Sequence, residues 1–236
     1  MGRKRTNGRR CTFEALENRR MFAGLVTARV SGGTLEVKGD FFSNAITITP
    51  GALPFEVKIT GNNDLNGLPT TVNGVVNGAI TFKNVIHGMN VNLGDGNNLL
   101  NVNGVTINGK VNLKTGKGVD AVALATNQLK SDLTIKTNRS MDTVTITNTT
   151  VRGTAKIKTG TGSDDVVVTN DPVANRIGAL KVNLGRGNDT VSFTGVSVNT
   201  KSTLKGGPGI DLLNNGISNF YGGTILHRGF QGGWGG

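Results

Sequence analysis

The chain has 236 residues, of which 36 are Gly and only 5 are Pro, and its formal net charge is +11. Scarce proline excludes the collagen-like and proline-rich classes, and a single cysteine excludes an intramolecular disulfide or a cysteine-based zinc site. A net +5 lies in residues 1–20 and the rest is spread along the body without a basic helix or an aromatic platform, so nucleic acid is not an expected partner. No apolar run approaches the roughly 18 residues of a membrane helix, so no transmembrane segment is expected.

The segment 1–24 differs in kind from the rest of the chain. A basic start leads into the string Phe13-Glu14-Ala15-Leu16-Glu17-Asn18-Arg19-Arg20-Met21-Phe22-Ala23. This string resembles the N-terminal motif of planctomycete extracellular proteins, although Asn18 and Met21 stand where other residues are commoner. The resemblance implies export or surface display and says nothing about the body. The alternative is a disordered basic tail on a cytoplasmic protein.

A repeat of about 22 residues organises the body. Turns of the form Gly-x-Asp or Gly-x-Asn, with Ser140 in place of Gly in one of them, end at positions 98, 120, 142, 164, 189 and 211, so all the intervals are equal except the longer one from 164 to 189. This long interval contains the string from Asp171 to Arg176, which we interpret as a loop inserted between strands.

Between these turns, apolar residues alternate with polar ones in three clusters per repeat, as in Val122/Leu124, Leu129 and Leu133/Ile135. Alternation with period two places one face of each strand inside. After the insertion we place the third cluster at Val182 and Leu184. The sequence therefore predicts an all-β fold, a right-handed parallel β-helix (β-solenoid) with three strands per coil. A β-sandwich or barrel of short strands is the rival architecture.

The expected organisation has four parts. Residues 1–24 form the export leader, cleaved or disordered, and residues 25–97 form irregular N-terminal coils, the first acting as a cap. Residues 98–215 form the regular coils, and residues 216–236 form a glycine-rich tail.

The turns invite a calcium hypothesis. Gly206-Gly207-Pro208-Gly209-Ile210-Asp211 resembles part of the calcium-binding nonapeptide repeat of exported toxins. Stacked coils would align the predicted calcium edge, which consists of Asp120, Asp142, Asp164, Asp189 and Asp211. Carboxylates about 4.8 Å apart repel one another. Neighbouring Lys and Arg, backbone amides in Asx-turns or bound calcium must offset this, and a purely structural role of Asp and Gly in the turns is the alternative to a metal site.

Catalysis has little support in the sequence. His87 and His227 have no repeated partner, and Asp164 with Asp165 is a carboxylate pair that any aspartate ladder would offer. We expect no enzyme activity. The expected protein is a secreted or cell-surface structural or adhesive β-solenoid, whose partners are extracellular matrix, cell envelope or polysaccharide. The alternatives are a calcium-binding exported repeat protein and a polysaccharide-binding or polysaccharide-cleaving β-helix.

Overall fold

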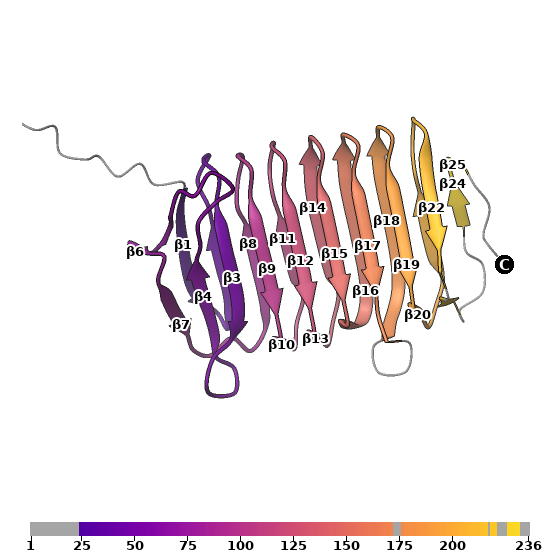
Figure 1. The fold of residues 1–236 in the computed structure, drawn as a ribbon. Helices are drawn as coiled ribbons and strands as arrows, with labels where there is room; N and C mark the ends of the chain where they lie inside the picture. The colour runs from indigo at the N-terminus through magenta and orange to yellow at the C-terminus, as the bar shows by residue number, and fades with distance from the viewer. Residues whose placement is uncertain (1–23, 172–175, 217, 221–225, 232–236) are drawn as a thin grey trace, which may run out of the picture.

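The structure is a computed structural model that describes residues 24–171, 176–216, 218–220 and 226–231. Every regular element in this part of the chain is a β-strand. Successive coils stack side by side from the N-terminal strands to the C-terminal ones (Figure 1), and they form a β-solenoid of about six turns. The predicted all-β solenoid is therefore confirmed. The predicted leader, except its last residue Gly24, lies outside the described residues.

Each coil has two long sides and one short side. The first long side consists of β2 (Thr34–Lys38), β8 (Gly88–Asn92), β11 (Val111–Lys114), β14 (Leu133–Arg139), β16 (Thr150–Thr161), β18 (Arg176–Arg186), β21 (Ser202–Lys205) and β24 (Leu226–Arg228). The second consists of β3 (Ala45–Pro50), β9 (Leu99–Asn103), β12 (Ala121–Ala125), β15 (Thr143–Thr147), β17 (Asp165–Thr169), β19 (Thr190–Thr194), β22 (Asp211–Asn215) and β25 (Phe230–Gln231).

The short side is made of very short strands, namely β10 (Thr106–Ile107), β13 (Gln128–Leu129), β20 (Ser197–Val198) and β23 (Asn219–Phe220). In two coils the short side belongs to the start of a long strand, because β16 and β18 pair with β13 and β20 before they turn onto the first long side. Three inward clusters per repeat thus correspond to three sides of unequal length. The strands β23, β24 and β25 fall within the predicted glycine-rich tail, so the stack extends past residue 215.

The strand register has the period of the sequence repeat. On the second long side, Leu100 pairs with Val122, Val122 with Val144 and Val144 with Val166, so each partner lies one repeat further along the chain. Val166 pairs with Val191 across the longer interval, so the ladder stays in register there too. Of the proposed insertion, residues 172–175 lie outside the described residues.

One part of the predicted register is wrong. The third cluster after the insertion consists of Leu180 and Val182, which pair with Ala155 and Ile157, and not of Val182 and Leu184. The error is a shift by one full period of the alternation. Such a shift leaves the same side chains facing inward, so alternation alone cannot detect it.

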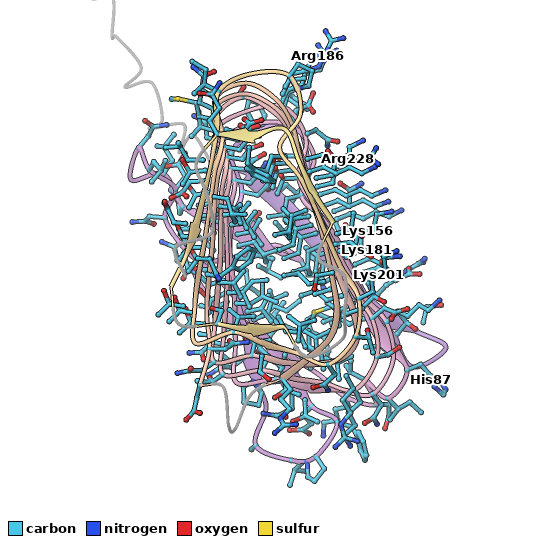
Figure 2. All side chains as sticks on the ribbon, turned by 90° about the vertical axis from the view of Figure 1, so that its right-hand side faces the viewer. His87, Lys156, Lys181, Arg186, Lys201 and Arg228 are labelled. Atoms are coloured by element: carbon cyan, nitrogen blue, oxygen red, sulfur yellow. The ribbon has the colours of Figure 1, made fainter. Side chains whose placement is uncertain are left out.

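The core is a set of apolar ladders inside the coils. In one of them Leu113, Ile135 and Ile157 stack in adjacent strands and are fully buried. Figure 2 shows the coil end-on as a long, narrow section with side chains filling its interior. Because each coil buries its apolar residues against its neighbours, stability depends on stacking rather than on any single coil.

Antiparallel strands occupy the N-terminal end. They are β1 (Gly24–Ser31), β4 (Val57–Gly61), β5 (Thr70–Val72), β6 (Val75–Val76) and β7 (Ala79–Phe82). β1 pairs antiparallel with β2, and β4 pairs antiparallel with β3 and β7, whereas β2 and β3 also begin the parallel stacks with β8 and β9. The irregular pattern before residue 98 thus corresponds to one coil plus an antiparallel cap that occupies the exposed strand edges.

The turn glycines have a steric reason. Gly187 has φ of 137°, a conformation that L side chains rarely adopt, and a Cβ atom there would overlap the carbonyl oxygen of Gly162 in the preceding coil. Gly209 stands in the same relation to Gly187. Stacked turns at the strand spacing leave little room for a side chain at this position, and this favours Gly; Ser140, which also has a positive φ, occupies the position in one coil.

Candidate functional site

The predicted calcium edge lies inside the coil, at the corner that precedes the second long side. Its five aspartates are at most 2% exposed. Oδ1 of each accepts a hydrogen bond from the backbone N–H of the equivalent residue in the preceding coil; for example, the N–H groups of Asp120 and Asp142 donate to Oδ1 of Asp142 and Asp164, both at 2.9 Å. Because the coils must stack in register for these bonds to form, the carboxyl groups fasten one turn to the next.

The second carboxyl oxygen of each aspartate is buried and has no hydrogen-bond partner of good geometry. A buried polar atom without a partner costs free energy, and a buried charge costs more. The five Oδ2 atoms therefore form a column that requires protons, a cation or polar hydrogens from elsewhere.

Asn44 and Asn98 continue the same ladder at its N-terminal end. Asn98 shows which kind of atom finds hydrogen-bond partners in the place of the aspartate Oδ2 atoms. Oδ1 of Asn98 accepts the N–H of Asn44 at 3.0 Å, as the aspartates do for their neighbours. Nδ2 of Asn98 donates to the carbonyls of Gly96 at 2.9 Å and Gly94 at 3.1 Å, and to Oδ1 of Asp120 at 3.0 Å. An amide N–H group thus has acceptors where a carboxylate oxygen has none.

Glycines confirm that these two kinds of atom occupy equivalent places. A Cβ at Gly39 would collide with Nδ2 of Asn44, and a Cβ at Gly206 would collide with Oδ2 of Asp211. Both glycines precede their ladder residue by five positions. The unpartnered Oδ2 atom of the aspartate therefore lies within the turn that precedes the aspartate, where Nδ2 of Asn98 donates to backbone carbonyl groups in the equivalent turn.

Burial raises the pKa of four of the five carboxyl groups. Removal from water is the largest cause in each case, and it raises the pKa of Asp142 to about 7 and those of Asp120 and Asp189 to about 6. The pKa of Asp164 is raised for the same reason. Repulsion between ladder neighbours adds to the rise at Asp142 and Asp189.

Threonines five positions before the aspartates moderate this effect. The hydroxyls of Thr115, Thr137 and Thr159 lie beside the carboxyls of Asp120, Asp142 and Asp164 and lower their pKa values somewhat. In the structure the hydroxyls of Thr115 and Thr137 donate to the carbonyl of the equivalent threonine one coil on, both at 3.3 Å. These hydroxyls can turn between carbonyl and carboxyl, so they provide polar hydrogens close to the column.

The lysines expected to flank the aspartates point the other way. Lys114, Lys136 and Lys158 lie on outward positions of the first long side. Within the described residues, the ion pairs are Arg29 with Glu36 and Lys83 with Glu56, and neither includes a ladder aspartate. Ion pairing with turn lysines does not offset repulsion in the ladder.

The residues weighed for catalysis are not brought together. Asp164 is buried at the inner corner, whereas its neighbour Asp165 is exposed on the outer surface of β17. Consecutive strand residues face opposite sides of a sheet, so the two carboxyls cannot share a substrate. His87 is exposed and directly precedes β8, several coils before β17.

Calcium at the edge stays a prediction. In the described parts of the chain, no three His, Cys, Asp or Glu side chains gather closely enough to hold a metal ion. Any cation at the edge would therefore depend on one or two carboxyl groups together with turn carbonyls and hydroxyls, which are the oxygen donors that calcium accepts.

A second polar ladder at another corner escaped the sequence analysis. Oδ1 of Asn127 accepts the N–H of Val105 at 3.0 Å, and Oδ1 of Asn170 accepts the N–H of Thr149 at 3.1 Å. Asn44 was also missed, because the cap separates it from Asn98 by much more than one repeat. The spacing from Asn127 to Thr149 could have revealed the second ladder, had polar and apolar positions been aligned together.

No helix in the described residues is long and apolar enough to cross a membrane. Comparison of the chain with protein-family models, with curated proteins and with solved structures gives no significant match.

Proposed function

We propose that this chain is a non-catalytic structural β-solenoid that acts as a stiff element outside the cell or on its surface. The observation that carries the proposal is the uninterrupted in-register stack from β3 to β22, held by an apolar core and a buried hydrogen-bond ladder. The N-terminal resemblance to exported proteins supports the location.

Removal of one whole coil tests the structural role. Deletion of residues 122–143 joins Ala121 to Val144, which occupies the same register position as Val122. We expect a folded protein that is shorter by about one strand spacing, ~4.8 Å, with a modestly lower melting temperature. Small-angle scattering gives the length, and circular dichroism gives the melt.

Deletion of residues 122–132 is the matched control, since it removes half a coil and puts every following strand out of register. It should abolish cooperative melting. Equal tolerance of both deletions would contradict a register-dependent rod. Export is tested separately by detection of the chain on intact cells before and after external protease.

The orphaned Oδ2 column favours calcium binding as a second candidate function. At pH 8 in chelator, addition of excess calcium should raise the melting temperature, because a ligand that binds only the folded state at about 100 times its Kd stabilises it by about 2.7 kcal/mol. Magnesium, which demands a tighter octahedral site, should have a smaller effect.

The double variant Asp142→Asn/Asp164→Asn should lose most of the calcium response. An unchanged melting temperature and no heat on calorimetric titration with calcium would end this hypothesis. The structural role would survive that result.

A further inference from the structure

Of the two long sides, the first carries nearly all of the outward charge, because its cationic residues recur with the coil period. The cationic face comprises the outward side chains of β2, β8, β11, β14, β16, β18, β21 and β24. Its first row consists of Lys38, Asn92, Lys114, Lys136, Lys158, Asn183, Lys205 and Arg228, which occupy paired positions in successive strands. Six of these eight positions are cationic and none is acidic. Figure 2 shows Arg228 of this row projecting from one side of the coil, the same side as Lys156 and Lys181.

A second row runs parallel to the first, two positions earlier in each strand. Here Lys156 pairs with Lys181, and the remaining positions from β8 to β21 are uncharged Asn or Thr. Glu36 begins this row at the N-terminal end and is already bound by Arg29 at 2.7 Å. The cationic face thus has almost no negative charge of its own to neutralise its lysines.

The opposite long side has a different surface. Outward positions of β9, β12, β15, β17, β19 and β22 are Leu, Ala, Thr, Val, Ser and Asn, with Asp165 as their charged residue. General solubility would not require such segregation, since charge on either side serves it equally. Of the two long sides, only the first therefore presents rows of cationic side chains.

Protection of sheet edges does not explain the lysines either. Lysine commonly blunts exposed edge strands, but β11, β14, β16 and β18 each have a hydrogen-bonded neighbour on both sides. Like charges that face each other across neighbouring strands are destabilising. The structure retains three such lysines in succession, Lys114, Lys136 and Lys158, which is expected if an external anion neutralises them.

Two hollows lie on this face. One of about 290 Å³ is lined by Lys156, Lys181 and Lys205 together with Asn183 and Thr203. The other, of about 490 Å³, lies at the N-terminal end of the rows and includes Lys38 and Lys114 among its lining residues. Amide and hydroxyl groups beside cations suit a ligand that carries both hydroxyls and carboxylates.

We propose that the cationic face binds a linear acidic polysaccharide that lies along the solenoid axis, with its uronate carboxylates against the lysine rows. A sugar unit and its glycosidic bond span a length close to the strand spacing of about 4.8 Å, so successive sugars would lie beside successive coils, most of which present a cation in the first row. A single-stranded nucleic acid would need aromatic stacking platforms, and the outward rows contain none at the described positions. This inference does not depend on where the protein acts.

The test measures binding of the full chain to polygalacturonate by calorimetry or interferometry in chelator at pH 7. The fully methyl-esterified polymer, which has the same backbone without charge, is the ligand control. We expect binding of the acidic polymer that weakens with added salt because exposed charges are screened, and at least tenfold weaker binding of the ester.

Two charge-matched variants locate the site. Lys156→Gln/Lys181→Gln removes two cations from the hollow of about 290 Å³, and Lys58→Gln/Lys130→Gln removes two cations that lie outside both rows. The first should lose tenfold or more in affinity and the second less than twofold, with unchanged melting temperatures in both. Equal loss in the two variants, equal binding of the ester, or tighter binding of a single-stranded oligonucleotide with the same number of charges would overturn the proposal.

Discussion

Raising the pH from 5 to 8 in chelator is expected to lower the melting temperature of the solenoid by roughly 10 °C or more. Burial raises the pKa of Asp142 to about 7 and those of Asp120 and Asp189 to about 6, whereas an unfolded aspartate has a pKa of about 3.9. The folded chain therefore holds these protons more tightly than the unfolded chain. Their contribution to stability is complete below about pH 4 and is lost as the pH rises through 6 and 7.

The size of the effect follows from the linkage. One pKa unit corresponds to about 1.4 kcal/mol, so each of these carboxyls costs on the order of 2–4 kcal/mol when it loses its proton, with less than full additivity because they are neighbours. A loss of about 1 kcal/mol lowers the melting temperature by about 2–4 °C in a chain of this size. Thermal melts followed by circular dichroism at several pH values measure the slope, and a flat or rising profile between pH 5 and 8 would refute the prediction.

The variant Asp142→Asn should raise the melting temperature at pH 8 and leave it unchanged at pH 5. The amide keeps the Oδ1 acceptor and replaces the orphaned oxygen by an N–H donor, as Asn98 does in the same ladder. Asp165→Asn is the control, since Asp165 is exposed on the outer surface and its loss removes one charge without touching the ladder. If both variants behave alike, the effect reflects net charge rather than the buried column.

The variant Ile135→Lys is expected to abolish cooperative melting of the central coils. Ile135 is fully buried and stacks between Leu113 and Ile157. Loss of a buried isoleucine alone costs about 2–5 kcal/mol, and an unpaired buried charge adds to that cost. Total stabilities of domains are about 5–15 kcal/mol, so little would remain.

Two controls accompany this variant. Thr145→Lys adds the same charge at an outward position of β15, where surface substitutions usually change stability by less than about 0.5 kcal/mol. Ile135→Val, which removes one methylene group, should cost about 0.5–1.5 kcal/mol. A cooperative melt of Ile135→Lys close to that of the unchanged chain would show that the ladder is not the main source of stability.

The fold could be predicted from the sequence because the repeat encodes it twice. The spacing of the Gly-x-Asp turns sets the coil length, and the alternation between them sets which side chains face inward. Alternation has a period of two, however, so it could not distinguish Leu180/Val182 from Val182/Leu184. The cap was not predictable in detail, because antiparallel pairing of β1 with β2 and of β3 with β4 depends on contacts that have no repeat.

The candidate site was predicted only in outline. The sequence aligned the five aspartates, but it could not show that they face the interior, since Asp and Lys both commonly occupy exposed turns. A position such as Asp164 is buried because its Oδ1 accepts an N–H from the coil before it, and only the stacked structure shows that bond. The cationic face was missed for a related reason: Lys114, Lys136 and Lys158 could be aligned in successive turns, but only the stacked structure shows that they point outward, away from the aspartates.

The uneven distribution of charge around the coil has a consequence for orientation. The solenoid is positively charged on one long side and nearly uncharged on the other, so it has an electric dipole perpendicular to its axis. On any negatively charged surface the solenoid would adopt one orientation, with its lysine rows facing that surface. The side of β12, β15, β17 and β19, with its outward Ala, Thr and Ser residues, would then be the one that the surroundings meet.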